Sequence, residues 1–485
     1  VYLVFDRRRG HQVALKILRS DSPYSILRFK NEFRGLSELA HSNLINLYDF
    51  HHESSRWFFT MEYVDGVDFL EWVRPYNLLL GEHETDLLRL RTAIEDLVKG
   101  VATLHLAGHL HRDIKPSNVL VDKTGRLTIL DFGLATRLED EDDRDVRGIS
   151  GTLEYMSPEQ TDGRKPTPAA DWYSVGVLLY QALTHELPFK GKPLKIALDK
   201  RLQDGPDPRT VVPSAPADLA ELCALLLKCE PSMRPSESDV MERLGIEASA
   251  SLSLSVSALS MSATDHLIGR ERHLSMLVGA FMLHDQKDAS LIRLHGQSGM
   301  GKSALLDAFL NPLREETQTL VLRGRCYQRE SLTFRAFDQI FDSFARFLSR
   351  SKPTLITEII PTGISALVTL FPVLQNVQEF ARKLSRRLPP SDPQELRKQA
   401  FRALRELLDN LSVHRKIVLC IDDAHHADLE SFALIRALLR TPSPSIFVLV
   451  AYHSEAESNS AFLQPLNEWL DSAESALEHS ELVVD

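Results

Sequence analysis

Residues 111–118 read HRDIKPSN, and this stretch decides the fold that we expect for the first half of the chain. It sets the carboxylate of Asp113 close in sequence to the ammonium of Lys115 and the amide of Asn118. A second stretch, Asp131-Phe132-Gly133, begins 18 positions after Asp113. Carboxylate and amide oxygens are ligands that Mg²⁺ prefers in proteins, so both stretches are candidates for one metal site.

Between these two stretches the sequence predicts a β-hairpin. Short apolar runs at residues 119–121 and 127–130 flank a polar turn at residues 123–125. Such a hairpin would bring Asn118 and Asp131 to one pocket, where both could hold a metal ion.

Two charged residues nearer the start of the chain complete the set. Lys16 ends the strand-like run Val13-Ala14-Leu15-Lys16, and Glu32 lies in a helix-like segment. Transfer of the γ-phosphoryl group of ATP requires a cation on the phosphates, acids that hold Mg²⁺, and a carboxylate that orients the attacking hydroxyl. Lys16, Glu32 and the groups above supply all three in order, so a lone ion pair or a chance tripeptide is a poor explanation.

The order and spacing of these residues resemble the protein kinase family over about half of the chain. The resemblance implies a bilobal α+β kinase fold and a catalytic base at Asp113. It also implies that Lys115 steadies the γ-phosphate and marks Ser/Thr rather than Tyr specificity. Lys16 would pair with Glu32, and Asn118 and Asp131 would hold Mg²⁺.

The same resemblance implies an adenine pocket. Ala14 would cover the base, Met61 would be the gatekeeper, and Glu62 to Val64 would form the hinge. In the larger lobe, the resemblance implies an ion pair between Glu159, in Ser157-Pro158-Glu159, and Arg234. It also implies that Asp171 braces the catalytic loop.

Two departures from the family pattern concern the start of the chain and the activation segment. Val1-Tyr2 corresponds to the strand just after the Gly-rich loop, so we expect a fragment that is truncated at its start and binds ATP poorly by itself. We expect truncation at the other end as well, because the chain stops at Asp485, before the helical lid that a resemblance to ATPase modules in the second half of the chain implies. The activation segment carries an acidic run at residues 139–145. This run is a solvated loop or, as a sharper hypothesis, a partial substitute for phosphate opposite Arg112. Ser150 and Thr152 are the candidate phosphosites.

A second nucleotide motif lies at residues 296–303, which read GQSGMGKS. The pattern follows an apolar strand-like run and precedes a helix-like one, as a P-loop requires. Glycines at 296, 299 and 301 let the backbone curl around phosphate, Lys302 would reach the β- and γ-phosphates, and Ser303 would bind Mg²⁺. An apolar run ends in Asp422-Asp423, which predicts Asp422 as an indirect Mg²⁺ ligand and Asp423 as the group that polarises the attacking water.

This second half resembles the STAND-like AAA ATPase modules of bacterial regulators. The resemblance rests on residues 267–272, residues 324–327 and the run Asp422-Asp423-Ala424-His425-His426-Ala427-Asp428. His426 stands where relatives usually have Trp, and His453 stands where they often have Arg. The latter weakens any claim that this position senses γ-phosphate.

The length of the chain and the spacing of its apolar runs predict how it divides into domains. A chain of 485 residues predicts two or three domains. We assign residues 1–245 to the kinase domain, residues 246–264 to a Ser/Ala-rich linker, which could also lie on a domain surface as a strand, and residues 265–485 to the ATPase. Apolar runs at 290–295, 318–322, 416–421 and 445–452 predict a mostly parallel sheet in the last part.

The net charge of −11 argues against binding to nucleic acid or an anionic membrane surface. No apolar run reaches the length of about 18 residues that a membrane span needs. The four cysteines lack metal-ligand spacing and indicate a reducing compartment without disulfides, so we expect a cytoplasmic protein. The pairs His51-His52 and His425-His426 are expected to be surface or loop imidazoles, because no matching set of ligands is near them in sequence.

These observations predict a bacterial Ser/Thr protein kinase that uses ATP and Mg²⁺, phosphorylates proteins in signal transduction, and is coupled to a P-loop switch. An alternative is a pseudokinase-like scaffold whose ATPase is the switch. The complete set from Lys16 to Asp131 favours the active enzyme. A third hypothesis is that the P-loop module forms homo-oligomers and brings kinase domains together.

Overall fold

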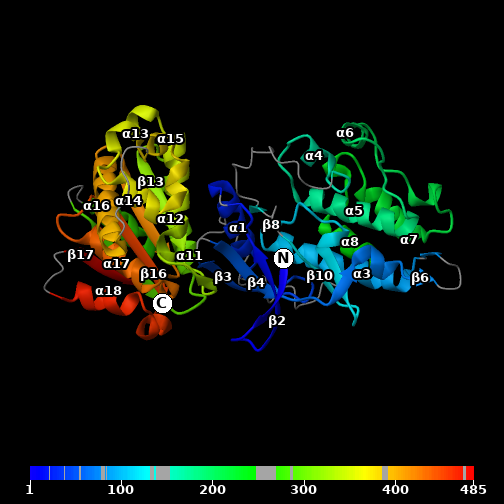
Figure 1. Cartoon of the computed structure of the whole chain (residues 1–485), viewed down its shortest axis with the longest axis horizontal. Coiled ribbons are helices and arrows are strands. Elements are labelled where there is room, and N and C mark those ends of the chain that lie inside the picture. The colour runs from blue at the N-terminus through cyan, green and yellow to red at the C-terminus, as the bar shows by residue number, and fades with distance from the viewer. Residues whose placement is uncertain are drawn as a thin grey trace. The chain divides into compact units, whose positions relative to one another are not determined.

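The structure is a computed structural model, and it describes residues 1–485 except 21, 38, 54–55, 78–81, 84, 132–135, 138–152, 247–268, 285–287, 385–391, 473–476 and 485. The chain divides into two compact units (Figure 1), the first built mainly from residues 1–260 and the second mainly from residues 261–485. The expected 246–264 linker lies outside the described residues, apart from Ile246.

The smaller lobe of the first unit is a sheet covered by one helix. Strands β1 (Tyr2–Asp6), β2 (His11–Ile17), β4 (Arg56–Glu62) and β3 (Leu47–Glu53) are neighbours in that order. Helix α1 (Pro23–Leu36) packs on the sheet through Phe29 and Phe33, whose rings lie 4.8 and 5.7 Å from that of Phe59. Burial of these rings holds α1 against the strands and so sets the position of its polar side chains.

The larger lobe is helical. Helix α3 (Leu87–Leu106) begins at Asp86, whose carboxylate accepts hydrogen bonds from the backbone N–H groups of Leu88 and Arg89, as a helix N-cap does. Helix α5 (Pro168–Thr184) is buried along almost its whole length, which is the pattern of a helix at the centre of a domain. The α+β fold expected for the first half is therefore confirmed.

The predicted hairpin is also confirmed. Strands β9 (Val119–Asp122) and β10 (Leu127–Ile129) pair antiparallel, with Leu127 opposite Val121. The backbone N–H of Leu130 donates to the carbonyl of Asn118 at 2.8 Å, which ties the two ends of the hairpin together. Asn118 and the start of the Asp131 stretch are thereby neighbours.

The remaining elements of the first unit connect and cover these parts. They are β5 (Gly66–Asp68), α2 (Phe69–Val73), β6 (Tyr76–Asn77), β7 (Glu82–His83), β8 (His109–Leu110), η1 (Pro116–Asn118), β11 (Thr136–Arg137), α4 (Pro158–Thr161), α6 (Pro193–Leu202), η2 (Pro208–Thr210), α7 (Ala217–Leu226), η3 (Pro231–Met233) and α8 (Glu237–Arg243).

The second unit is built on a five-stranded sheet in the order β13-β15-β16-β12-β17, with all neighbouring strands parallel. Four strands match the expected runs: β12 (Ser290–Gly296), β13 (Thr319–Arg325), β15 (Lys416–Asp422) and β16 (Phe447–His453). The fifth, β17 (Glu478–Val483), was not expected from the sequence. The α/β fold of the second half is confirmed, with a parallel sheet.

Helices cover both faces of this sheet (Figure 1). Val448, Val450 and Tyr452 of β16 pack in one core with α12 (Arg335–Arg350), α16 (Pro393–Ser412) and α17 (Leu429–Leu439). The alternate residues Phe447, Leu449 and Ala451 pack in another core with α10 (Glu271–Leu283) and α11 (Lys302–Glu315). A strand buried on both faces reads as a continuous apolar run, which is why the sequence identified it.

The other elements of this unit are short. They are β14 (Glu330–Ser331), α13 (Pro353–Ile359), α14 (Ile364–Leu370), η4 (Pro372–Asn376), α15 (Gln378–Leu384), η5 (Ala424–His426), η6 (Ser454–Asn459) and α18 (Leu463–Leu470). Across the described residues, no single helix has the length and apolar character to cross a membrane, and only the pair α13 and α14, bent by 102°, meets these criteria together.

Candidate active sites

Lys16 lies between two carboxylates in the first unit. Its position on β2 and that of Glu32 on α1 let Nζ donate to the Glu32 carboxylate, as expected, and also to Asp131 Oδ1 at 2.5 Å. Burial raises the pKa of Glu32 to about 7, against the opposing charge of Lys16. Partial burial opposes ionisation of Asp131, but the charge of Lys16 together with the hydrogen bonds to Lys16 and Glu32 outweighs it and holds the pKa of Asp131 below its usual value. Of the two carboxylates, Asp131 therefore has the lower pKa and is the one held more firmly in its ionised form.

Asp113 is held by two side chains of its own loop. Lys115 Nζ lies 2.7 Å from Asp113 Oδ2, and Asn118 Nδ2 donates to the same oxygen at 3.0 Å and to the Asp113 carbonyl at 2.8 Å. These contacts fix the carboxylate in one orientation. Orientation of this kind is what a base needs to receive a proton from an attacking hydroxyl.

Asp171 of α5 braces this loop from below. Its carboxylate accepts from the backbone N–H groups of His111 at 2.8 Å and Arg112 at 2.7 Å, which matches the expected role. His105 Nε2 lies 2.9 Å from the same carboxylate, and the sequence gave no signal for this partner. Arg112 adopts a left-handed backbone conformation with φ 66°, so the loop turns sharply just before Asp113.

The predicted ion pair between Glu159 and Arg234 is present. The guanidinium donates to both carboxylate oxygens, at 2.7 and 2.9 Å, and both side chains are almost fully buried. Arg234 also donates to the carbonyls of Lys228, Ala169 and Cys229. Gln160, next to Glu159, donates to the Arg112 carbonyl at 3.0 Å, which links this region to the catalytic loop.

A buried lysine that the sequence reasoning missed supports the segment before Glu159. Lys200 of α6 is fully buried, and its Nζ donates to the carbonyls of Leu153, Glu154 and Met156 at 2.6 to 3.0 Å. Burial lowers the pKa of Lys200 to about 7. Nothing in the local sequence distinguishes this lysine from its exposed neighbours on α6.

The adenine-pocket residues lie on the strands expected for them. Ala14 of β2 is buried and stands opposite Met61 of β4 in the sheet. Glu62 ends β4, and its carboxylate receives Arg126 Nη1 at 2.6 Å and Asn46 Nδ2 at 2.9 Å. Val64 follows just after the strand and is half-buried. The roles of these four residues toward adenine stay predictions.

Several predicted features lie outside the described residues. They are Phe132 and Gly133, the acidic run 139–145, and the candidate phosphosites Ser150 and Thr152. Arg112, the proposed partner of the acidic run, is described, but its pairing with that run stays a hypothesis.

The P-loop of the second unit joins β12 to α11. Gly301 has φ 82° and caps α11, a conformation that favours glycine, and Gly299 has the same φ. A Cβ on Gly296 would lie 2.2 Å from the carbonyl oxygen of Val484, so only glycine fits beside the end of β17. Lys302 Nζ donates to the carbonyls of Gly296 and Gln297 at 2.9 and 2.7 Å, and Ser303 follows it at the start of α11.

Asp422 and Asp423 lie at the carboxyl end of β15, which is separated in the sheet from β12, the strand before the P-loop, by β16 alone. Arg323 Nη2 lies 2.7 Å from Asp422, which is buried, and Arg325 Nε donates to Asp423 Oδ2 at 2.7 Å. Both arginines come from β13, and the sequence reasoning assigned no role to them. Burial lowers the pKa of Lys302, and the charges of Asp423 and Asp422 oppose this effect. The two acids and the P-loop lysine therefore share one electrostatic site.

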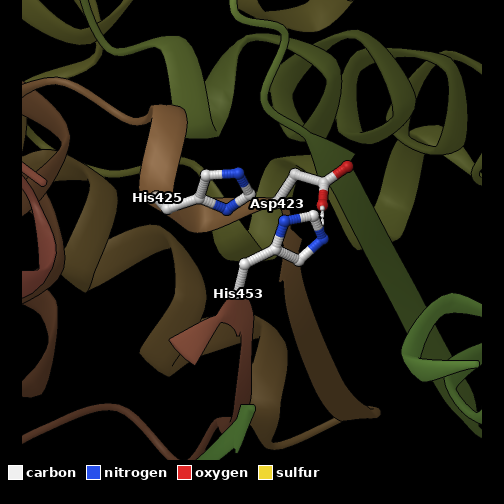
Figure 2. Close-up of side chains that lie close together, drawn as sticks. All are labelled: Asp423, His425 and His453. Atoms are coloured by element: carbon white, nitrogen blue, oxygen red, sulfur yellow. Dashed lines mark ion pairs between the residues drawn. The ribbon is translucent and has the colours of Figure 1, made fainter. Parts of the chain in front are cut away.

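His425 lies in the short turn η5, and two candidate ligands that the sequence did not indicate lie near it in space. Figure 2 shows His425, His453 and Asp423 close together, and their ligand atoms all lie within 4.8 Å of one another. His453 ends β16, which pairs with β15, so the parallel sheet brings it beside Asp423 from 30 positions away in sequence. Burial lowers the pKa of His425 to about 4, aided by the neighbouring imidazoles, and burial also lowers the pKa of His453.

The donor sets of both units fit Mg²⁺. Asn118 and Asp131 in the first unit, and Ser303 and Asp422 in the second, offer amide, carboxylate and hydroxyl oxygens, which are the ligands that Mg²⁺ prefers. The hairpin contact between Leu130 and Asn118 keeps the first pair together. In the second unit, the charge of Asp422 acts on Lys302, which is the residue next to Ser303.

Comparisons with known proteins agree with this geometry. Residues 1–244 match the family described as protein kinase domain, and residues 266–450 match the family described as AAA ATPase domain. The chain is 32% identical over 246 residues to serine/threonine-protein kinase PrkC of Bacillus subtilis, covering 50% of this chain and 37% of that one. It is 32% identical over 242 residues to serine/threonine-protein kinase PknA of Mycobacterium tuberculosis, covering 48% of this chain and 54% of that one.

Among solved structures, the twitchin kinase region from C. elegans aligns with a TM-score of 0.44 and 22% identity, over 51% of this chain and 43% of that one. The aligned parts span between about a third and about a half of the relatives in question. The family matches, the bacterial relatives and the two sites lead to one conclusion. This chain belongs to the protein kinase family, as a bacterial-type Ser/Thr kinase domain fused to an AAA ATPase domain.

Proposed function

We propose that the first unit transfers the γ-phosphoryl group of ATP to Ser or Thr hydroxyls of protein substrates. The observation that carries this proposal is the contact set around two carboxylates. Asp113 is oriented by Lys115 and Asn118, and Asp131 is kept anionic beside Lys16. A scaffold without phosphoryl transfer would have no need for all of these contacts, and the alternative of a pseudokinase is not supported.

In this mechanism each residue has a defined task. Asp113 accepts the proton of the substrate hydroxyl as its oxygen attacks phosphorus, and Lys115 neutralises charge on the transferred group. Lys16 holds the phosphates that stay behind, and Glu32 keeps Lys16 in place. Asn118 and Asp131 would hold Mg²⁺, which would neutralise charge on the phosphates.

We further propose that the second unit binds and hydrolyses ATP as a switch that regulates the kinase unit in signal transduction. Lys302 and Ser303 would hold the phosphates and Mg²⁺ with Asp422, and Asp423 would polarise the attacking water. The support is that both acids, at the end of β15, act electrostatically on Lys302 of the P-loop. Nucleotide-driven self-assembly that brings kinase units together is a second proposal, which light scattering with ATP and ADP would test.

We propose a reducing compartment, the cytoplasm, as the location. The support is that all four cysteines are free thiols, three of them buried.

The deciding experiment for the enzymatic proposal is transfer of radiolabelled phosphate by the whole protein to itself and to a generic basic protein.

The experiment compares two variants, each with a matched control variant. Asp113→Asn should abolish transfer, whereas Asp65→Asn, at an exposed acid of the same unit, should leave it intact. Lys302→Ala should change the rate or nucleotide dependence of transfer, and Lys398→Ala, at an exposed helix position, should not. Label on the Asp113→Asn protein would disprove the assigned base, and indifference to Lys302→Ala would remove the support for regulation.

A further inference from the structure

Three side chains from two parts of the second unit, the turn after β15 and the end of β16, converge beside its acidic strand end. Asp423 follows β15, His425 lies in η5, and His453 ends β16. Figure 2 shows the two imidazoles and the carboxylate gathered around one region, with all ligand atoms within 4.8 Å of one another. His453 Nε2 lies 3.7 Å from Asp423 Oδ1. The two oxygens of Asp423 thus have different neighbours, since Oδ2 receives Arg325 at 2.7 Å.

An unsatisfied polar atom lies in the same cluster. Within the described part of the chain, Nδ1 of His425 is buried and has no hydrogen-bond partner. A buried polar atom without a partner costs roughly 1–3 kcal/mol. Asp423 also has φ 51°, a left-handed conformation that is uncommon for a residue other than glycine. Unsatisfied atoms and strained backbone together are typical of a site that binds something.

The donor types select the class of ligand. Two imidazoles and one carboxylate are the ligands of Zn²⁺ and related transition-metal ions, whereas Mg²⁺ takes oxygen ligands. Tetrahedral Zn²⁺ with bonds of about 2.0–2.1 Å places its ligand atoms about 3.3 Å apart. The observed spread requires side-chain shifts of at most about 1.5 Å. Arg325 would act as the outer partner that orients the ligating carboxylate.

We propose that Asp423, His425 and His453 bind a divalent transition-metal ion of the Zn²⁺ class. Three protein ligands leave one tetrahedral position open for water or a phosphate oxygen. The bound ion takes up a lone pair of the Asp423 carboxylate and so withdraws this group from the activation of water. This consequence for hydrolysis rests on the proposed ATPase function, but binding of the ion does not.

The binding test uses Co²⁺ as a spectroscopic probe on the whole protein, with Mg²⁺ in excess to occupy the oxygen-ligand sites. Tetrahedral Co²⁺ has intense visible absorption, and Zn²⁺ should displace it. Loss of one outer partner of a metal ligand already weakens affinity by about 10- to 100-fold, so loss of a ligand itself should cost at least about tenfold. We therefore expect His425→Gln and His453→Gln each to weaken Co²⁺ binding by at least that factor.

The matched control is His414→Gln. His414 is a partly exposed imidazole of the same unit that lies 3.6 Å from the carboxylate of Glu358, outside the cluster. It should leave the Co²⁺ affinity and spectrum unchanged. Equal Co²⁺ affinity in the wild type and both cluster variants would overturn the proposed site, whatever the ATPase activity.

The functional test measures ATP hydrolysis in an Asp113→Asn background, so that the kinase unit adds no turnover. Zn²⁺ should inhibit hydrolysis in this protein, and His453→Gln should shift the inhibition to at least about tenfold higher Zn²⁺. If no preparation hydrolyses ATP while the Co²⁺ results hold, the ATPase proposal fails and the metal site stands. If Co²⁺ binds as expected while Zn²⁺ leaves hydrolysis unchanged, the withdrawal of Asp423 is refuted.

Discussion

Removal of Arg234 should destabilise the kinase unit more than removal of the charge on Glu159. The two side chains form a bidentate pair at 2.7 and 2.9 Å, with side-chain exposures of 0% and 4%. Arg234 has three further acceptors, the carbonyls of Lys228, Ala169 and Cys229. The perturbations are Glu159→Gln, Arg234→Met and the two together.

The magnitudes follow from what each change leaves behind. Breaking a buried pair by removing one partner costs about 3–5 kcal/mol. In Glu159→Gln the guanidinium keeps its three carbonyl acceptors, so we expect a cost near the lower value of about 3 kcal/mol. In Arg234→Met both carboxylate oxygens and three carbonyls lose a donor, so the cost should reach about 5 kcal/mol. The double variant leaves no buried charge unpaired and should cost about 2 kcal/mol less than the sum.

The assay is urea unfolding followed by tryptophan fluorescence in a Trp469→Phe background. Of the four tryptophans, Trp57, Trp72 and Trp172 lie in the first unit, so the signal then reports on that unit alone. The reasoning is refuted if Glu159→Gln costs as much as Arg234→Met, or if the two costs add. Equal costs would mean that the hydrogen bonds from Arg234 to the three carbonyls add nothing to the free energy of unfolding.

Three further predictions concern other buried groups. Lys200→Met should speed amide exchange at residues 153–156 and lower stability by about 1–3 kcal/mol, because three carbonyls lose their donor. Folding lowers the pKa of Lys200 from 10.5 to about 7, so the unfolded chain holds more protons between these values. The wild type should therefore gain stability relative to Lys200→Met as the pH rises from 7 toward 10, as urea unfolding at several pH values would show; a flat difference would contradict this. Gly296→Ala should abolish binding of a fluorescent ATP analogue to the P-loop, since the added Cβ would lie 2.2 Å from a carbonyl oxygen, whereas Gly279→Ala has free space and should bind normally. Asp171→Asn should reduce phosphate transfer at least about tenfold while ATP binding persists, because the His111 and Arg112 N–H groups donate to different carboxylate oxygens and the amide replaces one of these acceptors by an NH₂ donor; undiminished transfer would show that the loop holds its shape without it.

The parts of the fold that the sequence predicted are those with local signals. The hairpin from Val119 to Ile129 and the P-loop each depend on a few neighbouring residues, and both are where they were expected. Strand β17 was not predicted because residues Glu478 to Val483 mix charged and apolar side chains. The strand lies at the edge of the sheet, where a strand does not need the continuous apolar run of a strand buried on both faces.

Contacts between distant residues were harder to predict. The pairs Lys16 with Glu32 and Glu159 with Arg234 were expected only because of the family resemblance. Arg323 and Arg325 reach the acidic strand end because β13 pairs with β15 in register, with Arg325 opposite Asp422. Strand order in a parallel sheet is set by the whole core, so no local pattern gives it. For the same reason, His453 was not recognised as a neighbour of Asp423.

Three residues in left-handed conformation, Arg112, Asp131 and Asp423, have φ values of 66, 53 and 51°. Each non-glycine residue in this region gives up roughly 1–2 kcal/mol of stability. In evolutionary terms, glycine at any of them would relax the backbone, yet at Asp131 or Asp423 it would delete an acid from a nucleotide site. Laboratory selection for thermal stability alone would therefore favour variants that lack one of these acids and have lost activity at that nucleotide site. Libraries intended to stabilise the protein should hold these three positions constant.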